Sequence, residues 1–144
     1  TTEGNVIHYG YIEKFIEGLG ERFNIREIAF DRWGAVQMVQ NLEGMGFTIV
    51  PFGQGFKDMS PPTKELMKLT LEKRIAHGGH PVLRWMMDNI FIRTDPAGNI
   101  KADKEKSTEK IDGAVATIMA LDRAIRCGND NGASVYDTRG ILFI

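Results

Sequence analysis

Apolar residues recur at helical spacing in residues 7–22 and again in residues 34–43. A short, continuous apolar run follows each segment, at residues 25–30 and at residues 47–50, where Pro51 would end it. Short apolar runs between helical patterns are typical of parallel strands with both faces covered. The order helix, strand, helix, strand with short links therefore predicts an α/β fold with parallel strands.

The same pattern predicts three more helices. Ser60 before Pro61 has the form of an N-cap followed by proline at the first helical position, so we expect a helix from there to about residue 73. Pro81 opens a shorter helix. The last predicted helix covers residues 108–126, and its buried positions would be Ile111, Ala114, Val115, Ile118, Leu121 and Ile125.

A hairpin is predicted before this last helix. Residues 90–94 and 99–101 flank a segment in which Pro96 and Gly98 are placed as a turn requires. The stretch that follows, residues 101–107, carries charges of both signs. A solvated loop is the ordinary interpretation of such a stretch.

Composition mainly excludes classes of protein. The 144 residues predict one domain, residues 1–144, with 42% hydrophobic and 26% charged residues as in ordinary globular chains. The net charge of −1 shows no bulk basicity, so any nucleic-acid surface must be a local patch. Cys127 is the single cysteine, which excludes an internal disulfide. No apolar run has the length of a membrane span and no signal peptide is visible, so we expect a soluble, intracellular chain.

Two acidic residues stand where an α/β fold places its chemistry. Asp31 follows the apolar run 25–30, at the carboxyl end of a strand, which is the edge where open α/β sheets bind ligands. Asp112 lies at the start of the last predicted helix. Both have a structural alternative, because Asp31 is a good N-cap residue and Asp112 is favoured by the helix macrodipole.

Two other motifs are weaker. The glycine-containing segment 52–56 lacks the Gly-Lys-Ser/Thr ending of a P-loop, so no ATPase chemistry is visible. His77 and His80 suggest a metal site, but no cysteine or carboxylate stands beside them at ligand spacing. Contact of a loop histidine with a phosphate or a backbone carbonyl is the favoured interpretation.

Several phrases occur together in an order that resembles the nuclease domain of tailed-phage terminase large subunits. These are Phe30-Asp31-Arg32-Trp33, Gly53-Gln54-Gly55, Ser60-Pro61-Pro62-Thr63, His77-Gly78-Gly79-His80-Pro81, Asp103-Lys104-Glu105-Lys106-Ser107 and Lys110-Ile111-Asp112-Gly113. The resemblance implies a ribonuclease H-like fold and a metal-dependent endonuclease that cuts concatemeric double-stranded viral DNA during packaging. It implies that Asp31 and Asp112 are catalytic metal ligands. It also implies the terminase small subunit and the portal protein as partners, and the host cytoplasm as the location of a phage- or prophage-encoded protein.

The chemistry of phosphodiester hydrolysis explains these positions. Two Mg²⁺ or Mn²⁺ ions roughly 3.5–4 Å apart activate water and stabilise the attacked and leaving oxygens, and such ions prefer carboxylate ligands. We therefore expect Asp31 and Asp112 to face one another. Lys104, Lys106 and Lys110 would hold the DNA backbone without reading its sequence.

The departures from the family pattern predict an incomplete site. The resemblance implies preceding strands, one of which carries another essential aspartate, and an ATPase motor further upstream; we expect this chain to lack them. A third ligand from this chain would be Asp58, Asp88, Asp95 or Asp103, and the sequence favours none of them. Strand 25–30 would then have an open edge, through which the chain self-associates unless a segment such as residues 141–144 covers it.

Two other functions remain open from the sequence. One is a non-catalytic DNA-binding or docking module of the packaging machine. The other is a different ribonuclease H-like nuclease, such as a resolvase or transposase, which shares the acidic residues but lacks the Gly-Gln-Gly and His-Gly-Gly phrases.

Overall fold

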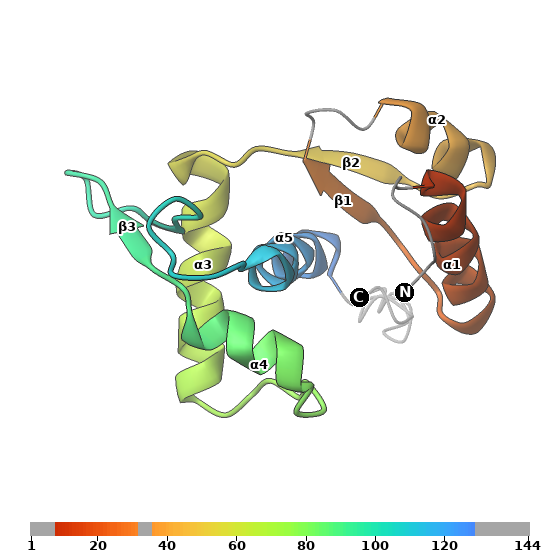
Figure 1. Ribbon diagram of the computed structural model, residues 1–144. Coiled ribbons are helices and arrows are strands. Elements are labelled where there is room, and N and C mark those ends of the chain that lie inside the picture. Colours follow the sequence, from red (N-terminus) through yellow and green to blue (C-terminus); the bar gives the residue numbers. More distant parts are fainter. Residues whose placement is uncertain (1–7, 32–35, 129–144) are drawn as a thin grey trace, which may run out of the picture.

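The computed structural model describes residues 8–31 and 36–128 (Figure 1). Its elements follow one another as α1 (Tyr9–Arg22), β1 (Ile28–Asp31), α2 (Val36–Gly44), β2 (Ile49–Phe52), α3 (Phe56–Leu71), α4 (Pro81–Asp88), β3 (Ile92–Thr94), β4 (Ile100–Ala102) and α5 (Asp112–Cys127). The predicted α/β order is confirmed. The parts of the predictions that concern residues 7, 34–35 and 141–144 lie outside the described residues.

The strands β1 and β2 form a parallel pair, with Ile28 opposite Ile49 and Asp31 opposite Phe52. Helix α5 contacts β1 and α2 contacts β2, and Figure 1 shows α2 and α5 on opposite sides of the strand pair. The prediction that residues 25–30 are fully covered is wrong, because the strand begins at Ile28 and its apolar residues are only half-buried. Pro51 lies inside β2 rather than after it, as an edge strand tolerates.

The core lies between α3, α5 and the end of the second hairpin strand. Its most deeply buried large side chains are Met59, Ile111, Ile118 and Pro62. The predicted buried stripe of the last helix is confirmed at Ala114, Val115 and Ile118, whereas Ile125 in the last turns of α5 is 54% exposed. The helix itself begins at Asp112, not at residue 108.

Helix α3 begins earlier than the sequence predicts. Its N-cap is Gly55, so Ser60 and both prolines lie inside the helix. Ser60 is buried, and its Oγ accepts a hydrogen bond from the backbone amide of Ile100 at 3.1 Å. The predicted cap is therefore wrong, and the serine instead joins α3 to β4.

The predicted hairpin is confirmed. Strands β3 and β4 are antiparallel, with Ile92 opposite Ala102, and the Asp95 carboxylate accepts the amides of Ala97 and Asn99 in the turn. Figure 1 shows this hairpin beside α3, away from the β1–β2 pair. Within the described part of the chain, no helix is both long and apolar enough to cross a membrane.

Candidate active site

Asp31 is the last residue of β1, and its side chain is exposed at the carboxyl end of the parallel pair. It lines a cavity of about 310 Å³. The other walls come from the link after β2, from both hairpin strands, from the loop that follows β4 and from α5: Gln54, Arg93, Lys101, Ala102, Asp103, Lys104, Glu105 and Val115. The strand end thus places Asp31 where the sequence predicts a ligand site, among charged groups of both signs.

Asp112 is the first residue of α5, and Ile111 before it is buried in the core. Burial of the neighbouring Ile111 and the helix start fix the backbone of Asp112, while its side chain remains 63% exposed. The ammonium of Lys104 lies 2.6 Å from Asp112 Oδ1. This hydrogen bond, helped by the charges of Lys104 and Lys110, lowers the pKa of Asp112 below its ordinary value of 3.8.

Asp112 does not line the cavity that contains Asp31, but Lys104 is a neighbour of both the cavity and Asp112. Its side chain lines the cavity that contains Asp31, and its ammonium holds Asp112. No group of three His, Cys, Asp or Glu side chains within residues 8–31 and 36–128 is placed to hold a metal ion. Convergence of Asp31 and Asp112 on a shared metal therefore stays a prediction.

The three predicted DNA-binding lysines differ in their surroundings. Lys104 is paired with Asp112, and the ammonium of Lys106 lies 5.5 Å from the ring centroid of Phe91. Lys110 is exposed and contributes to the field at Asp112. All three lie on the segment that leads into α5, so a DNA backbone contact there remains open to each of them.

Asp103 is the residue that the sequence leaves unresolved. It follows β4 directly, is only 6% exposed, and lines the same cavity as Asp31. Its Oδ1 accepts the backbone amides of Glu105 and Lys106, at 3.0 and 3.3 Å. Its Oδ2 is buried without a hydrogen bond from the described residues, and Arg93 Nη1 lies 3.8 Å away. A charged stretch gives no signal of burial, and the backbone contact of Asp103 with Phe91, ahead of β3, depends on the tertiary structure.

The remaining candidates for a third ligand lie elsewhere. Asp95 is used in the hairpin turn, Asp88 ends α4, and Asp58 lies in the first turn of α3 against Gly53. None of these three lines the cavity that contains Asp31.

The two histidines accept hydrogen bonds from backbone amides. His77 Nδ1 accepts from Gly79 at 3.2 Å, and His80 Nδ1 accepts from Leu83 at 3.4 Å. His80 is thereby the N-cap of α4, with Pro81 at the first helical position as predicted. These contacts account for the Nδ1 atom of each imidazole, and the predicted contact with a phosphate or a backbone carbonyl stays a prediction.

Comparisons with known proteins assign the chain to a family. Residues 1–127 match the family model described as terminase large subunit, endonuclease domain. The chain belongs to this family. It is 40% identical over 126 residues to the terminase large subunit of Enterobacteria phage HK97 and 32% identical to protein YmfN of Escherichia coli (strain K12), covering 86% of this chain in both cases. The crystal structure of the HK97 bacteriophage large terminase matches 86% of this chain and 26% of that chain, with a TM-score of 0.77 at 40% identity.

The chain spans only 25% of the HK97 protein and 28% of YmfN. The match to the solved HK97 structure covers most of this terminase nuclease domain, which supports the mixed helix and strand architecture described above. The family resemblance predicted from the co-ordered phrases is confirmed.

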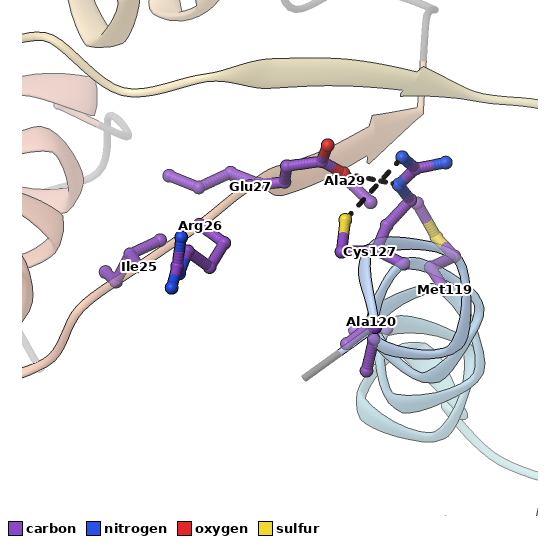
Figure 2. A pocket seen from close by; sticks show the side chains of 12 residues that line it. Ile25, Arg26, Glu27, Ala29, Met119, Ala120 and Cys127 are labelled. Carbon is purple, nitrogen blue, oxygen red and sulfur yellow. Dashed lines mark hydrogen bonds and ion pairs between the residues drawn. The ribbon is translucent and has the colours of Figure 1, made fainter. Parts of the chain in front are cut away.

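A second cavity of the terminase domain lies between β1 and the C-terminal half of α5 (Figure 2). It has a volume of about 470 Å³. Glu27 Oε2 lies 2.6 Å from Arg123 Nε, and this bond lowers the pKa of Glu27. Glu27 in turn raises the pKa of the Cys127 thiol, which disfavours the thiolate form needed by a cysteine nucleophile. The cavity near Asp31 is therefore the better candidate for the active site.

Proposed function

We propose that this chain is the metal-dependent endonuclease domain of a phage DNA-packaging motor, and that it cuts concatemeric double-stranded DNA by hydrolysis of phosphodiester bonds. One observation carries the proposal: Asp31 ends a parallel strand at a charged cavity, and Lys104 of the same cavity holds Asp112. The resemblance implies that this pair of acids belongs to the reaction centre. By resemblance, the fold would be ribonuclease H-like.

The two carboxylates are ligands of the type that a hard divalent cation prefers. The described residues contain no group of three such ligands, so they do not form a complete metal site. Mg²⁺ and Mn²⁺ prefer carboxylate oxygens, which Asp31 and Asp112 supply from the end of a strand and the start of a helix. When bound, such ions lower the pKa of water and stabilise charge on phosphate oxygens. By resemblance, a further aspartate on an upstream strand would complete the ligand set.

The protein residues have distinct roles in this proposal. Asp31 and Asp112 would hold the ions, while Lys104 stabilises the negative charge of Asp112. Lys106 and Lys110 would hold the DNA backbone through charge alone, without reading bases. The DNA, the terminase small subunit and the portal protein are the partners that the resemblance implies, in the host cytoplasm.

Metal binding tests the proposal directly. The free Mn²⁺ signal in electron paramagnetic resonance should report binding to the chain, and Asp31→Asn and Asp112→Asn should each weaken it by about tenfold or more. Asp88→Asn removes the same charge at the end of α4, away from the cavity, and should leave binding unchanged. Equal Mn²⁺ binding by the chain and both site variants would rule out these ligands.

A non-catalytic DNA-binding module is the second candidate. It is favoured by the lack of a three-donor metal group in the described part of the chain. Cleavage of linear duplex DNA with Mg²⁺ or Mn²⁺ separates the two, measured on a longer chain that also carries the further aspartate implied by the resemblance. Tight DNA binding by that longer chain without cleavage would favour the module.

A further inference from the structure

Two positive residues face each other across the hairpin. Arg93 on β3 lies directly opposite Lys101 on β4 in the antiparallel register. Like charges at directly opposite positions destabilise a strand pair. Both residues line the cavity that contains Asp31, so the unfavourable pair stands at the candidate active site.

Lys101 already has partners. Its ammonium donates to the carbonyl of Gln54 at 3.2 Å and lies 5.3 Å from the ring centroid of Phe56. These contacts tie β4 to the segment between β2 and α3, which accounts for Lys101 in structural terms.

Arg93 is different. Its Nη1 lies 3.8 Å from Asp103 Oδ2, which is an ion pair beyond hydrogen-bond distance, and 54% of its side chain is exposed. A guanidinium presents five N–H donors in a flat fork. An ion pair on one side of this fork leaves donors directed elsewhere for an anion.

Asp103 is held rigidly. Its Oδ1 accepts two backbone amides, its own amide donates to the carbonyl of Phe91, and Ser107 Oγ donates to its carbonyl at 2.7 Å. A buried carboxylate oxygen without a hydrogen bond attracts the nearest cation strongly. Among the described residues, the ion-pair partner of Asp103 Oδ2 is the guanidinium of Arg93.

We propose that Arg93 binds a backbone phosphate of duplex DNA at the rim of the Asp31 cavity, and that Asp103 is a positioning residue that holds the guanidinium there. Arginine suits this role because its fork matches two phosphate oxygens at once. The contact is to the backbone, so it fixes the position of the duplex relative to Asp31 without sequence preference. This inference deepens the proposed nuclease function. It rests on that function, because placing the duplex beside Asp31 serves cleavage only if Asp31 belongs to the nuclease site.

The first test measures duplex DNA binding by fluorescence anisotropy in EDTA, at several salt concentrations and with two unrelated sequences. Arg93→Ala should weaken binding of both sequences by about tenfold and should reduce the slope of log affinity against log salt by about 0.9, the value for one phosphate. Arg74→Ala is the matched control, because Arg74 is 64% exposed, paired with Glu72, and absent from the cavity. Equal effects of the two substitutions, or no salt-dependent binding by the unaltered chain, would overturn the inference.

Arg93→Lys separates the fork from the charge. It should keep most of the salt slope and still reduce affinity, because an ammonium cannot bind two phosphate oxygens in one plane. Affinity equal to that of the unaltered chain would show that only the charge matters and would overturn the proposed phosphate fork.

Asp103→Asn tests the positioning role, because the two possible roles of Asp103 predict opposite changes in DNA affinity. Asparagine keeps an oxygen that can accept the amides of Glu105 and Lys106, so the loop should be preserved. Removing a negative charge beside DNA should strengthen binding if Asp103 acts through charge alone. If Asp103 positions Arg93, binding should instead weaken, and this weakening should be absent when Arg93→Ala is already present. Stronger binding in Asp103→Asn would overturn the positioning role.

These measurements test the Arg93 phosphate site independently of the nuclease proposal. They contain no divalent metal, so DNA binding that depends on Arg93 can stand even if Asp31 and Asp112 prove not to bind Mn²⁺. Mn²⁺ binding at the two acids with no effect of Arg93→Ala on DNA affinity would remove the phosphate site and leave the nuclease proposal intact.

Discussion

The ammonium of Lys104 lies 2.6 Å from Oδ1 of Asp112, so a predicted DNA contact and a predicted metal ligand are bonded to each other. The two residues lie eight positions apart, on the loop after β4 and at the start of α5. Their pairing places a positive charge beside the carboxylate to which we assign a metal. It also makes the ionisation of Asp112 depend on Lys104.

Replacement of Lys104 should raise the pKa of Asp112. The hydrogen bond from Lys104 is the largest cause of the lowered pKa of Asp112, so Lys104→Met should return it toward 3.8. Carboxyl-carbon chemical shifts followed through a pH titration would measure the change. Lys106→Met removes the same charge from a side chain that lies over Phe91 and should have a much smaller effect.

The same pair predicts a pH dependence of stability. A carboxyl whose pKa is lowered on folding stabilises the native state above its unfolded pKa, and this effect disappears as pH falls through its folded pKa. The difference in denaturation midpoint between the unaltered chain and Lys104→Met should thus be present at neutral pH, decrease as pH falls below 3.8, and vanish once pH is below the lowered pKa of folded Asp112. A difference that persists in acid would show that the lysine acts through packing.

The basic segment before α5 should give salt-dependent DNA binding. Replacement of Lys104, Lys106 and Lys110 together by Ala should reduce the slope of log affinity against log salt, by up to about 0.9 for each phosphate that the variant no longer neutralises. Lys104 should contribute least, because its ammonium is already paired with Asp112. Anisotropy titrations of the single and triple variants measure this, and an unchanged slope in the triple variant would show that the segment is only a solvated loop.

Ile118 should be far more sensitive to truncation than Ile125, a predicted core position further along the same helix. Ile118 is 1% exposed on α5, so Ile118→Ala should lower the free energy of unfolding by about 2–5 kcal/mol. Ile125 is 54% exposed, and Ile125→Ala should change it by less than about 0.5 kcal/mol. Urea denaturation of both variants checks the ratio; similar decreases would contradict the described packing of α5.

Removal of the Ser60 hydroxyl should weaken the contact between α3 and β4. Ser60→Ala leaves the amide of Ile100 without its acceptor, which should cost about 1–3 kcal/mol. Hydrogen exchange at the Ile100 amide should accelerate more than exchange at the amide of Thr63, which an N-cap at Ser60 would hold. The reverse pattern would support the N-cap role that the sequence predicts.

The open side of β1 should drive self-association. Among the described residues β1 pairs with β2 alone, and the second cavity, lined by Ile25, Ile28 and Ala29, lies against β1. Strand edges of this kind pair with other chains unless they are covered or charged. Light scattering should show concentration-dependent association that Ile25→Lys reduces and Val36→Lys, a change on α2, does not. A monomer at all concentrations would favour coverage of the edge, for which residues 141–144, outside the described part, are the predicted segment.

Elements whose signals are local could be predicted from the amino-acid sequence. Helical periodicity indicated the helices α1, α2 and α5, the turn residues 95–98 indicated the hairpin, and Pro81 marked the start of α4. The family could be predicted because several phrases occur in a fixed order across nearly the whole chain, and the match over residues 1–127 confirms it. The sequence also predicted a strand ending near Asp31 and Asp112 in the first turn of the last helix, and the structure places both acids at such ends although the strand and the helix begin later than predicted.

Burial and pairing between distant residues depended on tertiary packing. Ser60 has every local feature of an N-cap, but a partner 40 residues away, the Ile100 amide, gives it a different role. Asp103 lies in a charged stretch that predicts exposure, and the packing of the hairpin buries it. Arg93, Asp103 and Lys104 meet Asp31 at one cavity because the chain folds strand ends and loops together, and a contact of that kind leaves no periodic pattern in the sequence.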